Sequence, residues 1–200
     1  MFFQSLERIR SIADRHSGKT YTPEGLTHLI RMQFRDPQLR FRTERDPRVE
    51  RDNFWIKGEY RPLDDEYGNP CITITLTFPR RRHVNAIDTL DWDSLSFYIA
   101  DVVTHEYLHQ YYSRARDFRD GCGYRHKSNH LYSETMQDYL GCEDEILAHG
   151  FNVVSEMAVY GTRMEMTRTY RLYRQHFRHD QKIMLKLRRQ ANKYLKRLES

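Results

Sequence analysis

The segment with the clearest chemical meaning is HEYLH, which places His105 and His109 four residues apart, with Glu106 directly after the first histidine. In an α-helix, residues four apart lie one turn apart on the same side, so both imidazoles can bind one metal ion. Two imidazoles at this spacing suit zinc, and Glu106 is then turned toward the flank where the attacking water would lie. The pattern predicts His105 and His109 as zinc ligands and Glu106 as the catalytic general base.

The segment 91–113 must carry this motif. It begins with Asp91 and Asp93, where the helix dipole favours negative charge, and it continues without glycine or proline. We therefore expect a helix over 91–113. Two histidines beside a glutamate can also lie on a helix surface without any function. The apolar side chains around the motif favour a core helix instead, in which these polar groups would be costly to bury without a metal.

A third ligand is needed, because a catalytic zinc ion normally has three protein ligands and one open position. Glu145 begins the apolar face of the next expected helix, over 143–159, and the intervening chain is long enough to return antiparallel to the first helix. Glu143 is the alternative ligand. Either carboxylate can also serve only to stabilise the N-terminus of its helix. We favour Glu145 as the third ligand.

The chain resembles known metallopeptidases in two segments, HEYLHQYY and YLGCEDEILAHGFN. Together they resemble the two motifs of HExxH metallopeptidases encoded by tailed bacteriophages. The second segment is also similar to the Glu-x-x-Ala-x-x-Phe helix of the ImmA/IrrE-like peptidases. The resemblance covers about residues 91–158. It implies a zincin-like fold in which zinc binds His105, His109 and Glu145.

Within the second segment, the resemblance implies that Ala148 and Phe151 pack beside the metal. Zincins with a glutamate ligand often place an aspartate four residues later to orient one of the histidines. In this chain that position is His149, so no residue is assigned to that role. The activity implied by the resemblance is zinc-dependent hydrolysis of peptide bonds in a protein substrate, by a phage-encoded enzyme in the host cytoplasm.

The rest of the chain predicts an α+β fold. Alternating β-branched and aromatic residues predict two neighbouring strands in 53–60 and 71–78. We expect an exposed connection over 35–52 and mostly loop over 117–141. Apolar residues at three- and four-residue spacing predict further helices over 2–16, 22–34, 162–178 and 180–199.

Charge divides the chain into two expected parts, a zincin-like catalytic domain over residues 1–160 and a basic helical extension over 161–200. The extension holds 12 Lys and Arg against 3 Asp and Glu, whereas residues 1–160 have a net charge of −4. Its last helix could contact nucleic-acid phosphates, or it could pack on the body or on a second copy of the chain. The apolar stripe of that helix is Met184, Leu187, Ala191, Tyr194 and Leu198. Its cations are Lys182, Lys186, Arg188, Arg189, Lys193, Lys196 and Arg197.

Three smaller groups of residues suggest further roles. The arginines 80–82 and His83 follow a predicted strand, where they could favour acidic substrates or simply end the strand in solvent. A structural zinc site is an alternative for residues otherwise expected in loops, namely Cys122, His126, His130 and Cys142. An oxyanion donor could come from Tyr124, His126, His130 or Tyr132.

The composition argues against a membrane-spanning or secreted protein. The three cysteines favour a reducing compartment, and no stretch approaches 18 apolar residues. We therefore expect a cytoplasmic chain with no membrane span and no secretory signal. The predicted function is zinc metallopeptidase. Two alternatives are a nucleic-acid-associated protein with a structural zinc, and a non-catalytic virion or host-interaction protein on a zincin scaffold. The sequence leaves the substrate and the oligomeric state open.

Overall fold

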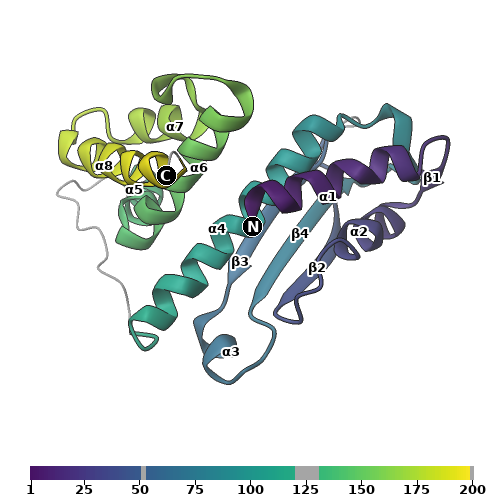
Figure 1. Ribbon diagram of the computed structural model, residues 1–200, viewed down its shortest axis with the longest axis horizontal. Helices are drawn as coiled ribbons and strands as arrows, with labels where there is room; N and C mark the ends of the chain where they lie inside the picture. The colour runs from purple at the N-terminus through teal and green to yellow at the C-terminus, as the bar shows by residue number, and fades with distance from the viewer. Residues whose placement is uncertain (51–52, 120–130, 199–200) are drawn as a thin grey trace. The chain divides into compact units, whose positions relative to one another are not determined.

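The computed structural model describes residues 1–50, 53–119 and 131–198 (Figure 1). The chain forms two compact units, Met1–Gln110 and Tyr111–Ser200. The expected boundary between residues 160 and 161 does not coincide with the boundary of these units. The reason is that the C-terminal helices share a hydrophobic core with helices that precede residue 160.

The first unit contains helices and two small sheets. In the larger sheet the strand order is β2-β4-β3, with β2 parallel and β3 antiparallel to β4. In the smaller sheet β1 pairs antiparallel with β5. The elements are α1 (Phe2–Arg15), β1 (Thr20–Tyr21), α2 (Pro23–Arg31), β2 (Leu39–Asp46), β3 (Trp55–Tyr60), α3 (Pro62–Glu66), β4 (Ile72–Pro79), β5 (Asn85–Ala86), a 3-10 turn (Ile87–Thr89) and α4 (Trp92–Ala115), whose last turn belongs to the second unit.

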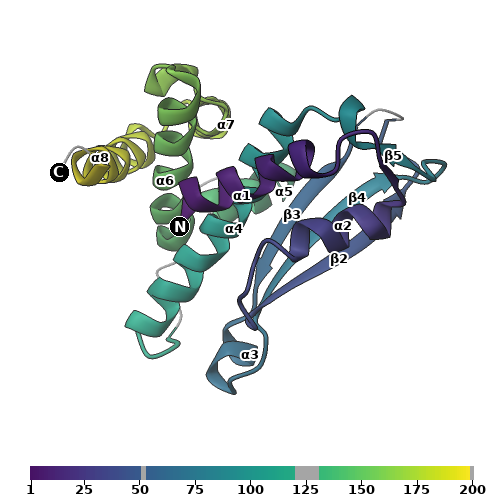
Figure 2. The same ribbon diagram turned by 45° about the vertical axis from the view of Figure 1, so that its right-hand side comes forward.

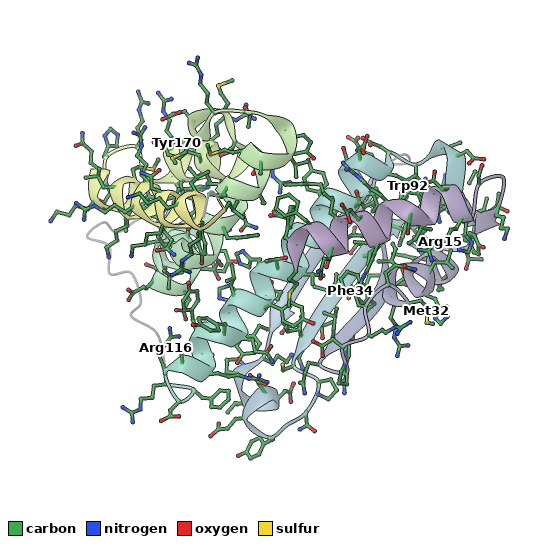
Figure 3. The ribbon with its side chains drawn as sticks, viewed as in Figure 1. Arg15, Met32, Phe34, Trp92, Arg116 and Tyr170 are labelled. Carbon is green, nitrogen blue, oxygen red and sulfur yellow. The ribbon has the colours of Figure 1, made fainter. Side chains whose placement is uncertain are left out.

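The central strand β4 forms the middle of the core of this unit. Ile72, Ile74 and Leu76 alternate along β4 and therefore point to one side of the sheet. They share one buried cluster with apolar residues of α1, α2 and α4, so these helices cover that face. Figure 2 shows α2 lying over β2 and β4. Phe34 and Trp92, which Figure 3 labels, pack against the same cluster.

The prediction of an exposed connection over 35–52 is wrong where β2 lies. Along β2, buried and exposed residues alternate: Leu39 is buried and Phe41 is half-buried, whereas Arg40 and Arg42 are exposed. Because only one face of this strand is covered, every second residue is free to be charged, and the hydrophobic signal of the strand is weak. The two strands expected in 53–60 and 71–78 are confirmed as the antiparallel neighbours β3 and β4.

The second unit is built from helices around a core of its own. One buried cluster joins α5 and α6 to α7 and α8, and it consists of Leu140, Ile146, Val153, Val154, Tyr170, Tyr173, Phe177, Ile183, Leu187, Ala191 and Tyr194. Tyr170 on α7 is labelled in Figure 3. The elements of this unit are α5 (Leu131–Gly141), α6 (Glu143–Tyr160), a 3-10 turn (Met164–Met166), α7 (Arg168–His176) and α8 (Gln181–Leu198).

A buried carboxylate fixes the start of α7 against α6. Glu156, which is 6% exposed, accepts hydrogen bonds from the backbone N–H groups of Arg168 (2.6 Å) and Thr169 (3.1 Å). These are N–H groups that the first turn of a helix leaves without intrahelical partners, and a negative charge there also suits the helix dipole. Gly161 ends α6 with a φ of 61°, a left-handed conformation that glycine adopts without strain.

The helices expected in 2–16, 22–34, 91–113, 143–159 and 180–199 are confirmed, with small shifts at their ends. The prediction of mostly loop over 117–141 is wrong for its last part, which forms α5. Gly141 is the last residue of this helix, where glycine does not interrupt a helical hydrogen bond.

Within the described ranges, no helix combines the length and the apolar character that crossing a bilayer requires.

Candidate metal centre

The two histidines of the HExxH motif lie one turn apart on α4, in the first unit. Their Nε2 atoms are 2.9 Å apart, and the ring centroids are 4.6 Å apart. Neighbouring ligand atoms in a tetrahedral zinc site, each 2.0–2.1 Å from the ion, are roughly 3.3 Å apart. At the observed separation one imidazole can donate an N–H to the other, or both lone pairs can bind the same metal ion. The pair therefore fits two of the three protein ligands expected from the sequence.

Glu106 lies against the edge strand β3. A Cβ placed on Gly58 of β3 would overlap the Glu106 carboxylate, lying 2.6 Å from its Cγ and 2.7 Å from its Cδ. Real side chains do not approach this closely, so the carboxylate occupies this position only because residue 58 has no side chain. Glu106 is 7% exposed and His105 is 8% exposed, which means that both polar groups are largely withdrawn from water.

Two hydrogen bonds fix the rotation of α4 about its axis near the motif. The Tyr107 hydroxyl donates to Asp36 Oδ2 at 2.5 Å, and Gln110 Nε2 donates to Asp65 Oδ1 at 3.0 Å. Burial, together with the nearby Asp36 carboxylate, raises the pKa of Tyr107, so the phenol keeps the proton that it donates. Since these bonds hold residues on either side of His109, they set the direction of the HExxH side chains relative to the sheet.

The sequence-predicted third ligand, Glu145, lies in the first turn of α6 in the second unit, where three acidic residues follow one another. Glu143 is exposed, and Asp144 forms a bidentate ion pair with Arg116, with N–O distances of 2.6 and 2.7 Å. Figure 3 labels Arg116. Glu145 is 8% exposed. A buried carboxylate is costly unless a cation or a hydrogen-bond donor compensates it. Of the three, Glu145 therefore has the environment expected of a metal ligand.

His149 is the neighbour of Glu145 one turn further along α6. Its Nδ1 is 3.5 Å from Glu145 Oε2, 2.9 Å from the Glu145 carbonyl oxygen and 3.1 Å from the Tyr173 hydroxyl. That hydroxyl donates its proton to the Leu140 carbonyl at 2.8 Å, and burial, followed by the Glu145 charge, keeps the pKa of Tyr173 high. Nδ1 of His149 therefore faces oxygen acceptors. This assigns the proton of the neutral imidazole to Nδ1 and leaves the lone pair on Nε2.

Two of these residues were missed by sequence reasoning. Gly58 had a detectable signal, because an isolated glycine inside a strand marks a close approach of another group. His149 was noticed only as a departure from the aspartate of other zincins. Its position beside Glu145 makes it a further residue with a ligand atom to offer in the second unit.

Several predicted residues fall elsewhere. Cys122, Tyr124, His126 and His130 lie outside the described residues, so the second zinc site and most of the oxyanion donors stay predictions. Tyr132 belongs to α5, and Cys142 is the residue that precedes α6.

The arginines that follow β4 do not lie along an edge strand, because β4 is the central strand of its sheet. Together with His83, these arginines, residues 80–82, instead line an open cleft of about 1190 Å³, whose other walls include Pro47 and Val49. The cleft lies where the parallel strands β2 and β4 both end. Of the two roles considered for these residues, a strand end in solvent agrees with the exposure of Arg80, Arg81 and His83.

Comparison with known proteins adds no relative: no family model matches the chain, and no curated protein or solved structure is significantly similar to it. The resemblance to phage and ImmA/IrrE-like metallopeptidases stays a prediction from the two motifs.

Proposed function

We propose that this chain is a zinc-dependent peptidase, with His105 and His109 as ligands from α4 and Glu145 as the ligand from α6. The observation that carries the proposal is the 2.9 Å separation of the Nε2 atoms of His105 and His109 on α4. Glu106, the residue after His105, is buried against the edge strand β3. Two imidazoles and a carboxylate are a donor set that catalytic zinc sites use. The choice of Glu145 over Glu143 is supported by its burial and by its contact with His149.

Each residue has a separate role in the proposed reaction. Zinc, when bound, supplies Lewis acidity, which lowers the pKa of water and polarises a peptide carbonyl. Glu106 accepts a proton from the attacking water and returns it to the leaving amine. Gly58 leaves the room in which the Glu106 carboxylate lies, and Tyr107 and Gln110 hold the helix in the rotation that keeps it there.

A peptide substrate is favoured by the position of Glu106. It touches β3, which among the described residues pairs only with β4 and is therefore an edge strand of their sheet. An extended peptide that pairs with β3 through its backbone would run past the general base. This supports a protein substrate over a small molecule. A phage-encoded enzyme working in host cytoplasm is the setting that the two motifs suggest.

The proposal is tested by metal content and cleavage together. The purified chain should hold about one zinc ion, measured by mass spectrometry of the metal, and should create new protein N-termini in a bacterial lysate. A chelator should remove both the metal and the cleavage, and added zinc should restore both. A structural zinc would be present without any new N-termini, and a chain that never binds zinc would contradict the proposal outright.

Replacing Gly58 by alanine should displace the Glu106 carboxylate while the metal ligands stay in place. Because a displacement of about 1 Å in a catalytic group can cost 10²-fold in rate, cleavage should fall by about that factor, with zinc content unchanged. The matched control is Gly25→Ala, since a Cβ at Gly25 meets its neighbours at an ordinary 3.4 Å. Equal rates for the two variants would show that the contact with Gly58 does not position the general base.

A further inference from the structure

The last helix of the chain uses its apolar side inside the second unit. Ile183, Leu187 and Ala191 of α8 are buried in the same cluster as Val153 and Val154 of α6. The backbones approach closely at Gly150 of α6: a Cβ placed there would lie 2.7 Å from Gln190 Cγ and 3.3 Å from the Ala191 nitrogen. The middle of the apolar stripe, Leu187, Ala191 and Tyr194, is therefore already covered, whereas Leu198 at the end of the helix is exposed. The covered part is not available for pairing with a second copy or for insertion into a lipid surface.

The opposite side of α8 carries an unbroken row of cations, which we call the basic stripe. At 100° per residue its members fall within an arc of about 100°, and they extend over roughly 22 Å of the helix. All of its members are exposed. The basic stripe consists of Lys182, Lys186, Arg189, Lys193, Lys196 and Arg197.

Three cations in the middle of the basic stripe are not neutralised by any residue that the structure describes. The residues of α8 include no aspartate or glutamate. Arg188, which lies off the stripe, pairs with Glu165 at 2.9 Å, whereas Lys186, Arg189 and Lys193 form no ion pair with any residue that the structure describes. Like charges three and four residues apart destabilise a helix. A row of them that is kept on the surface, in a helix that is stably packed by its other side, indicates a polyanionic partner.

We propose that the basic stripe binds the phosphate backbone of nucleic acid without reading bases. Over 22 Å, one strand of a duplex presents about six phosphates, which matches the number of cations in the stripe. Contacts of lysine and arginine with phosphates do not depend on the base sequence, so the proposal covers binding to the backbone only. An amphipathic helix that binds membranes inserts its apolar face, which α8 has buried. This inference is independent of the proposed peptidase activity.

The test is fluorescence anisotropy of the full chain with a labelled 25-base-pair duplex DNA, titrated at several salt concentrations. We expect binding at low salt that weakens steeply, with a slope of log affinity against log salt of about −5. The triple variant Lys186→Gln, Arg189→Gln and Lys193→Gln should bind at least 10-fold more weakly, and its salt slope should be smaller by about 3. All three positions are exposed, so circular dichroism should show an unchanged fold.

The matched control removes the same number of charges from the first unit, through Arg8→Gln, Arg40→Gln and Arg42→Gln, all at exposed positions. This variant should bind as the parent chain does; equal weakening of both variants would mean that net charge alone attracts DNA, and would overturn the proposal. A parallel titration with single-stranded RNA shows which of the two sources of phosphodiester, DNA or RNA, the basic stripe binds more tightly. No binding at low salt, or tighter stripe-dependent binding to phosphatidylserine vesicles than to either nucleic acid, would also overturn it.

Discussion

Replacing Glu106 by glutamine should leave zinc bound and slow peptide-bond cleavage by about 10²- to 10⁴-fold, the usual contribution of a general base. Glutamine has nearly the same shape as glutamate, so it fits the space beside Gly58 that the carboxylate occupies. It cannot accept the proton of the attacking water, however. The loss should therefore appear in the chemical step, with the metal site and the fold intact.

The measurement compares the rate at which new protein N-termini form in a lysate with the zinc content of the same preparation. Glu44→Gln is the control, because it removes one negative charge from an exposed position on β2. The control should cleave at the parent rate. Cleavage by the Glu106 variant at the parent rate would remove the general-base role, and loss of zinc in that variant would show that Glu106 is a ligand instead.

The local part of this architecture was predictable from the sequence. The helix over 91–113 follows from an uninterrupted apolar segment with acidic residues at its start, and Asp91 does cap it, accepting a hydrogen bond from the Ser94 backbone N–H at 3.0 Å. A hydrogen bond from the Ser94 side chain, together with this backbone bond, lowers the pKa of Asp91. The same-side placement of His105 and His109 follows from helical geometry alone. Signals of this kind depend on residues within a few turns of one another.

What the sequence missed depends on distant parts of the chain. The strand β2 is charged on its open face, so only its parallel partner β4 shows that it is a strand. The C-terminal helices look like an appendage by charge, since their lysines and arginines lie outside, yet their apolar sides complete the core of α6. The net charge of a segment reflects its exposed side chains, whereas a compact unit is defined by the apolar side chains that it buries together.

In the candidate site, too, local features were predictable from the sequence and contacts between distant residues were not. Spacing identified three of its residues on α4, but the contact of Glu106 with Gly58 joins positions 48 residues apart. Glu143 and Glu145 could be ranked only weakly from the sequence, because both lie in the first turn of the same helix. Burial distinguishes them, since Glu145 is 8% exposed and Glu143 is exposed.

This difference makes Glu145→Gln and Glu143→Gln a matched pair for the third ligand. Each variant removes one negative charge from the first turn of α6, so each should lose a similar helix-dipole stabilisation, about 0.3–1 kcal/mol. Only Glu145→Gln should lose zinc. Its zinc affinity should fall by at least about 100-fold, since removing a partner of a ligand already costs 10- to 100-fold.

The affinities are measured by competition with a zinc-binding dye, and the free energies of unfolding by urea denaturation of the metal-free proteins. Similar unfolding free energies with different zinc affinities would separate ligation from helix stability. If Glu143→Gln loses the metal while Glu145→Gln keeps it, the third ligand is Glu143. If both keep it, neither glutamate of this turn completes the site, and His149 becomes the residue of α6 to replace, because its Nε2 lone pair is the remaining donor beside Glu145.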